Sequence, residues 1–172
     1  MSSEIPNFAR LLAPFITAIP DASRPGFLAL LERGAAERYR AWAEECDPAD
    51  REGLLACAAR EDEIADRVEQ ILPAAEADRP KLRAELPRAR DAYFAVFEEL
   101  PLGEKLRLQA GAERQGAAAW RMIASQQEDS ARREALERCA ALEDESAAHL
   151  ETLLGEPVRA TRRDSEVLRE QR

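Results

Sequence analysis

Residues 57–72 read CAAREDEIADRVEQIL, and residues 139–154 read CAALEDESAAHLETLL. The two stretches align without a gap, and nine of the sixteen positions are identical. The identities include a cysteine, a Glu-Asp-Glu triplet and a later glutamate in register, which a shared alanine-rich composition does not account for. A weaker likeness precedes each stretch, at residues 34–42 and 111–120. We therefore interpret the chain as two diverged copies of one helical hairpin.

Proline and glycine punctuation predicts four long helices, near residues 25–46, 48–72, 102–125 and 130–154. Asp47-Pro48 is typical of a helix start, and Gly155 of a helix end. The long connection at 73–101 contains a short aromatic helix over 88–100. We expect an all-α four-helix bundle, made of two duplicated hairpins with one long crossover. The expected divisions are an N-terminal docking arm at 1–23 with a short apolar helix over 8–16, a bundle at 24–155, and a polar C-terminal tail at 156–172.

Composition narrows the range of partners. The formal net charge of the 172-residue chain is −9, with acidic and basic residues interspersed, and such a surface repels nucleic acid. The longest apolar stretch near the start is too short to span a membrane and has no basic leader, so we expect no membrane insertion. Three cysteines without a CxxC pair favour a reducing compartment, and hence the cytoplasm. A homodimer is one way to cover the apolar arm and the aromatic crossover.

Each long helix has an apolar stripe that a single glutamate interrupts. These glutamates are Glu37, Glu61, Glu113 and Glu143. Glu37 and Glu61 each lie twelve residues from Ala49, and Glu113 and Glu143 each lie fifteen residues from Glu128. At a rise of about 1.5 Å per residue, the two members of each pair share one height on their hairpin. We therefore predict one interior layer of four carboxylates.

A Glu on the first and third helices and Glu-x-x-His on the second and fourth form the di-iron signature of the ferritin-like superfamily, rubrerythrins included. The chain resembles this superfamily over roughly residues 25–154, with Glu37, Glu61, Glu113 and Glu143 at the carboxylate positions. The resemblance implies a metal site at these glutamates that takes iron or manganese. The chain departs from the signature at both histidine positions, where Ile64 and Ser146 stand. An all-oxygen donor set favours hard, oxygen-loving metals at reduced affinity.

Two functions from different classes follow. The first is a ferritin-like protein whose four glutamates weakly bind iron or manganese and which acts in oxidative or metal chemistry. The second is a metal-free bundle that binds a small molecule or a partner, with the carboxylates neutralised by arginines such as Arg38, Arg60 or Arg114. His149 is expected on the solvated surface beside Glu145. The sequence specifies neither a substrate nor whether the protein is an enzyme.

Overall fold

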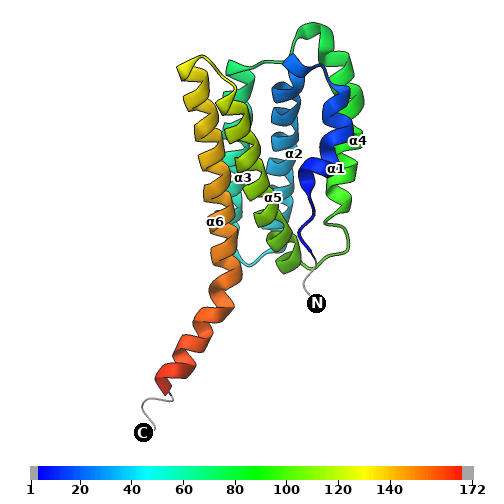
Figure 1. Ribbon diagram of the computed structural model, residues 1–172. Coiled ribbons are helices and arrows are strands. Elements are labelled where there is room, and N and C mark those ends of the chain that lie inside the picture. The colour runs from blue at the N-terminus through cyan, green and yellow to red at the C-terminus, as the bar shows by residue number, and fades with distance from the viewer. Residues whose placement is uncertain (1–3, 168–172) are drawn as a thin grey trace.

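The computed structural model describes residues 4–167, with side chains over 4–155. Within that range the chain forms six α-helices and no strand, so the predicted all-α class is confirmed (Figure 1). The helices are α1 (Phe8–Ala18), α2 (Arg24–Glu45), α3 (Pro48–Ile71), α4 (Arg79–Ala95), α5 (Leu102–Ser125) and α6 (Ser130–Val167). None of the described helices is long and apolar enough to cross a membrane.

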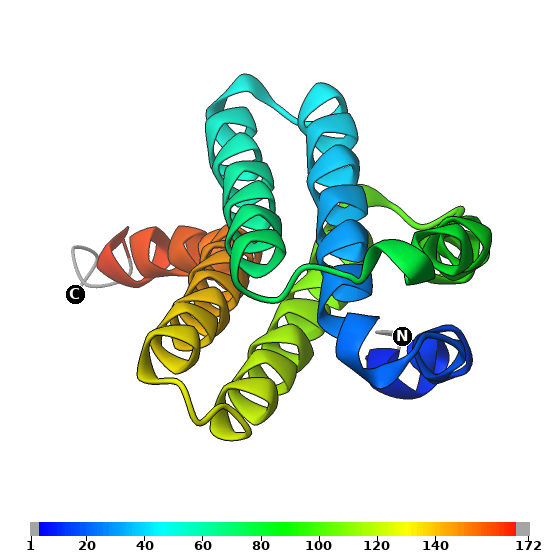
Figure 2. The same cartoon turned by 90° about the horizontal axis from the view of Figure 1, so that it is seen from above.

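The four long helices pack side by side as two antiparallel hairpins. α2 pairs with α3 and α5 with α6, and α3 packs on α6 to join the hairpins (Figures 1 and 2). The predicted spans of the first three long helices agree closely with these bounds. Their starts carry the expected prolines: Pro25 and Pro48 lie in the first turn of α2 and α3, and Pro101 is the N-cap residue of α5. Sequence punctuation alone therefore located the hairpins.

α1 and α4 form a second layer against one side of the long helices (Figure 2). They pack on each other and on α2, around a cluster of Ile19, Phe27, Leu82 and Ala89. α4 overlaps the helix predicted at 88–100, but it begins nine residues earlier and ends five residues earlier than predicted. Pro80 suits the first turn of α4, and Pro87 is accommodated inside the helix. The proline-rich sequence therefore concealed the first half of a helix that packs on α1 and α2.

The fourth long helix does not end at Gly155, as the sequence predicted. α6 continues to Val167, and its last turns project beyond the bundle (Figure 1). None of the described glycines has a positive φ, so Gly155 does not adopt the left-handed conformation that closes many helices. The predicted boundary between the bundle and the C-terminal tail, at residue 156, is therefore not the end of a helix. Residues 168–172 of the predicted tail lie outside the described residues.

The hydrophobic core is divided into two halves along the bundle. One half gathers Tyr39, Trp42, Leu54 and Cys57, and the other gathers Ile64, Val68, Trp120, Leu136 and Cys139. Cys57 and Cys139 are both fully buried free thiols. The two thiols lie in different core halves.

The outer ion pairs of the two hairpins follow one pattern. On the first hairpin, Arg33 pairs with Asp62 and Glu69, and Arg40 also pairs with Asp62. On the second, Arg114 pairs with Asp144 and Glu151, and Arg121 also pairs with Asp144. The basic partners are 81 residues apart in sequence and the acidic partners 82 residues apart. The same arrangement of ion pairs between two neighbouring helices therefore occurs in both hairpins.

Candidate functional site: an interior carboxylate cluster

Four glutamates meet at the centre of the bundle, one from each long helix. Glu61, Glu113 and Glu143 are at most 3% exposed, as the sequence predicted. The fourth is Glu32 of α2, which the sequence reasoning did not identify. Glu32, Glu61 and Glu143 each offer one carboxylate oxygen, and these oxygens lie within 4.8 Å of one another. Glu113 is close enough to raise the pKa of each of the other three.

The prediction that Glu37 belongs to this interior layer is wrong. Its side chain is 59% exposed and forms an ion pair with Arg90 of α4. Glu37 follows Glu32 by five residues, which turns the side chain by about 140° around the helix axis. It therefore faces the outer helix layer, and it is not a candidate ligand.

The misplacement has a definite origin in the position of the turn. α2 ends at Glu45 and α3 begins at Pro48, so the hairpin is centred between Cys46 and Asp47. The sequence prediction centred it at Ala49. Glu32 lies thirteen residues before the end of α2, and Glu61 lies thirteen residues after the start of α3. Glu32, and not Glu37, therefore lies at the same height on the hairpin as Glu61.

Hydrogen bonds hold two of the carboxylates in place. The Tyr39 hydroxyl donates to Glu113 Oε1 over 2.6 Å, and the Gln109 amide donates to the same oxygen. The indole Nε1 of Trp120 donates to Glu143 Oε1 over 3.1 Å. Glu61 Oε1 and Glu113 Oε2 are buried and have no hydrogen-bond partner. Such orphaned acceptors are rare in proteins and call for a proton, a water molecule or an ion.

The arginines proposed as neutralisers do not pair with the cluster. Arg38 is buried, donates to Gln109 Oε1 over 2.8 Å and lies against four aromatic rings, those of Trp42, Tyr93, Phe94 and Phe97. Arg60 pairs with Glu145, and Arg114 pairs with acidic residues on the outer surface. None of the ion pairs found among residues 4–155 includes a carboxylate of the cluster.

Burial and mutual repulsion favour protonation of the cluster. Burial raises the pKa of Glu32 from 4.5 to about 7, and the neighbouring Glu113 adds to the rise. Burial also raises the pKa of Glu61 and of Glu143 well above the usual range, and the other carboxylates add to both rises. The charge of Arg38 lowers the pKa of Glu32, but less than burial raises it. The metal-free cluster therefore holds protons that a cation would displace.

Gly116 makes room for Glu143. A Cβ atom on Gly116 would lie 2.5 Å from Glu143 Oε1 and 2.8 Å from its Cδ. Both distances are closer than any real contact of this kind. A side chain at residue 116 would therefore push Glu143 out of the cluster.

The residues at the two signature histidine positions are both fully buried. Ile64 packs in the core half that contains Val68 and Trp120, and Ser146 is buried beside the thiol of Cys57. His149 was expected in solvent beside Glu145, and this is wrong. Its Nε2 is buried without a partner, close to where a Cβ on Gly53 would lie, and burial lowers its pKa. We therefore find no imidazole that joins the cluster.

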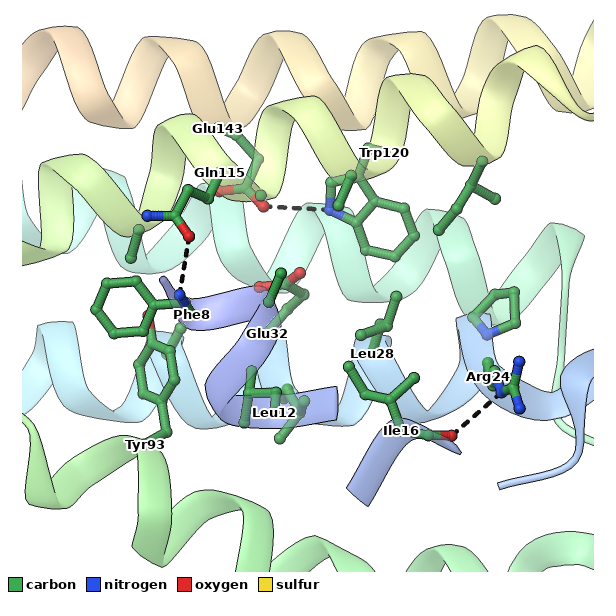
Figure 3. A pocket seen from close by; sticks show the side chains of 18 of the residues that line it. Phe8, Leu12, Ile16, Arg24, Leu28, Glu32, Tyr93, Gln115, Trp120 and Glu143 are labelled. Atoms are coloured by element: carbon green, nitrogen blue, oxygen red, sulfur yellow. Dashed lines mark hydrogen bonds between the residues drawn. The ribbon is translucent and has the colours of Figure 1, made fainter. Parts of the chain in front are cut away.

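A cavity of about 650 Å³ adjoins the cluster between α1, α2 and α5. In Figure 3, Glu32, Glu143 and Trp120 face this cavity, with Leu12 and Leu28 nearby. Glu32 is the only member of the cluster that is partly exposed rather than buried. A molecule in the cavity would therefore reach the carboxylates first at Glu32.

No protein-family model, no curated protein and no solved structure matches the chain.

Proposed function

We propose that the protein is a metal-binding helical bundle, in which Glu32, Glu61 and Glu143 bind one oxygen-loving cation and Glu113 adjoins it. The observation that carries this proposal is the gathering of three carboxylate oxygens within 4.8 Å around buried, unpartnered acceptors. Burying one unpaired carboxylate costs several kcal/mol even after relaxation. A multivalent cation would offset that cost for the whole cluster at once.

The donor set fits iron or manganese better than softer metals. All of the donors are carboxylate oxygens, and the cluster has no thiolate or imidazole among the described side chains. Without the two histidines of the signature, we expect weak binding. A bound iron or manganese ion would supply Lewis-acid or redox chemistry at the wall of the cavity.

The chain's own residues prepare the site in three ways. Tyr39 and Trp120 orient Glu113 and Glu143 through hydrogen bonds to one oxygen of each, which leaves the second oxygen without that donor. Gly116 allows Glu143 to approach. The raised pKa of Glu32 makes it a proton acceptor near neutral pH, at the position that faces the cavity.

A diverged ferritin-like origin with duplicated hairpins belongs to the same proposal. Two features support it: one interior glutamate on each long helix, and the repeated ion pairs of Arg33 and Arg40 with those of Arg114 and Arg121. The repeat also relates Tyr39 to Trp120, each of which donates a hydrogen bond to a cluster glutamate. We infer that the ancestral hairpin already carried the carboxylate and its donor.

Calorimetric titration of the chelator-treated protein with Mn²⁺ tests the metal proposal. We expect one weak site in the wild type, and at least tenfold weaker binding after Glu61→Gln or Glu143→Gln. Glu37→Gln is the matched control, because Glu37 is an exposed glutamate on the same bundle, and it should leave binding unchanged. Binding that is absent from the wild type, or that Glu37→Gln weakens as much as Glu61→Gln, would overturn the proposal.

A metal-free bundle is the second candidate, and the protonation of the cluster favours it. Glu61 lies at hydrogen-bonding distance from both Glu32 and Glu113, so shared protons can neutralise the cluster without a cation. In that case the cavity would serve as a small-molecule or partner site. The titration above separates the two candidates, because a proton-neutralised cluster gives no saturable Mn²⁺ site at pH 8.

A further inference from the structure

The cavity beside the carboxylate cluster lies on the side of the bundle that α1 covers. α3 and α6 close the opposite side of the bundle, whereas α1 lies over the space between α2 and α5 (Figures 1 and 2). Its volume of about 650 Å³ is within the range of small-molecule sites. α1 runs along it from Phe8 to Ile16, a length of about 12 Å at the usual helical rise. The space is therefore elongated.

Its walls are apolar along most of that length. The apolar lining includes Leu12, Ile16, Leu28, Leu31, Ala119 and Ile123. The carboxylate cluster forms one polar region of the wall, and Gln126 and Gln127 lie near the other end. A ligand that fits has an apolar body and a polar group that reaches the cluster.

The polar lining of the cavity favours a neutral end group over an anionic one. Three arginines line the cavity. Arg24 and Arg90 each have an acidic partner, whereas Arg38 has none among the described residues and its buried Nε makes no hydrogen bond. Arg24 pairs with Asp21 and donates to the carbonyls of Ile16 and Ile19, Arg38 donates to Gln109, and Arg90 pairs with Glu37. An anionic head group would meet one arginine without an acidic partner and the four carboxylic groups of the cluster, so acidic groups outnumber available basic groups there. A neutral hydroxyl can donate to Glu32 or accept from it, so it fits Glu32 with or without a proton.

α1 is held over the cavity without filling it. At its N-terminal end, the Gln115 side chain accepts from the Phe8 amide and donates to the Pro6 carbonyl, both over 2.8 Å (Figure 3). At the other end, Arg24 Nε donates to Ile16 O over 3.2 Å and to Ile19 O over 3.1 Å. These polar contacts fix α1 at both ends, so that its apolar face borders an open space.

We propose that this cavity binds an elongated, uncharged, mainly aliphatic molecule with a hydroxyl-type end at Glu32. Its length suits a chain of roughly ten carbon atoms, given the helical span of about 12 Å. The apolar walls are present whether the cluster holds protons or a cation, and the preference for a neutral end group is proposed for the metal-free protein.

The test uses the chelator-treated protein with the neutral fluorophore N-phenyl-1-naphthylamine, whose emission rises in apolar sites. We expect saturable binding, displaced by 1-decanol and at least tenfold less effectively by decanoate at pH 8. Ala119→Phe, which enlarges a lining residue, should weaken fluorophore binding at least tenfold. Ala118→Phe on the exposed face of the same helix is the matched control and should leave binding unchanged. Ala119→Leu serves the same purpose if the larger side chain prevents folding.

Three results would overturn the proposal: no saturable fluorophore binding, equal displacement by decanoate and decanol, or equal weakening by the two phenylalanine variants. The Mn²⁺ titration is run on the same preparations. Loss of metal binding with intact fluorophore binding would refute only the metal proposal, and the reverse result would refute only the cavity ligand.

Discussion

Replacing Glu32 by glutamine should make the metal-free protein less sensitive to pH. In the folded state the pKa of Glu32 is raised from 4.5 to about 7, so the folded state holds this proton more tightly than the unfolded state does. The stability that the proton confers is fully present below pH 4.5 and is lost as the pH rises through 7. At about 1.4 kcal/mol per pKa unit, the full loss is about 3 kcal/mol, most of it between pH 5 and pH 8.

The assay is urea unfolding of the chelator-treated protein at pH 5, 6, 7 and 8. The difference in unfolding free energy between Glu32→Gln and the wild type should change by about 2.5 kcal/mol from pH 5 to pH 8, in favour of the variant. Taking the difference removes the contribution of His149, whose lowered pKa acts in the opposite direction. Glu37→Gln, on the exposed face of α2, should show no such change. A Glu32→Gln difference that is flat with pH would refute the placement of Glu32 in a buried carboxylate cluster.

Three further changes test the parts around the cluster. Gly116→Ala should weaken Mn²⁺ binding at least tenfold, because the added Cβ would meet Glu143. Gly103→Ala, whose added Cβ would have no atom within 4 Å, should leave the affinity unchanged. Equal Mn²⁺ affinities of the two variants would contradict the close approach of Glu143 to Gly116. Arg38→Ala should lower the unfolding free energy by about 3 kcal/mol, because it removes a buried side chain packed on aromatic rings; a loss below about 1 kcal/mol in urea unfolding would argue against this packing role. Tyr39→Phe should cost about 1–2 kcal/mol by removing a buried donor to Glu113, and unchanged stability would count against that hydrogen bond.

Sequence punctuation predicted the long helices because proline and cap residues have local causes. It predicted only the second half of α4, whose proline-rich start reads as a loop, and it ended α6 at Gly155, where the glycine stays helical. These two errors arise because tertiary packing and helix continuation are not local properties.

The apolar stripe gave the correct phase for Glu61, Glu113 and Glu143 but not for α2. α2 packs on α3, α1 and α4, so buried residues surround most of its circumference and no single stripe marks the bundle centre. A signal in the sequence did exist. Residues 32–40 read ERGAAERYR and residues 113–121 read ERQGAAAWR, which aligns Glu32 with Glu113. The second Glu-Arg pair, at Glu37, concealed this alignment.

Anomalous X-ray diffraction from crystals grown with Mn²⁺ tests most directly whether Glu32, Glu61 and Glu143 hold a cation. We expect an anomalous peak among these three carboxylates, within about 2.0–2.6 Å of their oxygens, the range of hard-cation coordination. Crystals that show Mn²⁺ only at surface acidic residues such as Glu37, or no manganese at all at saturating concentration, would contradict it.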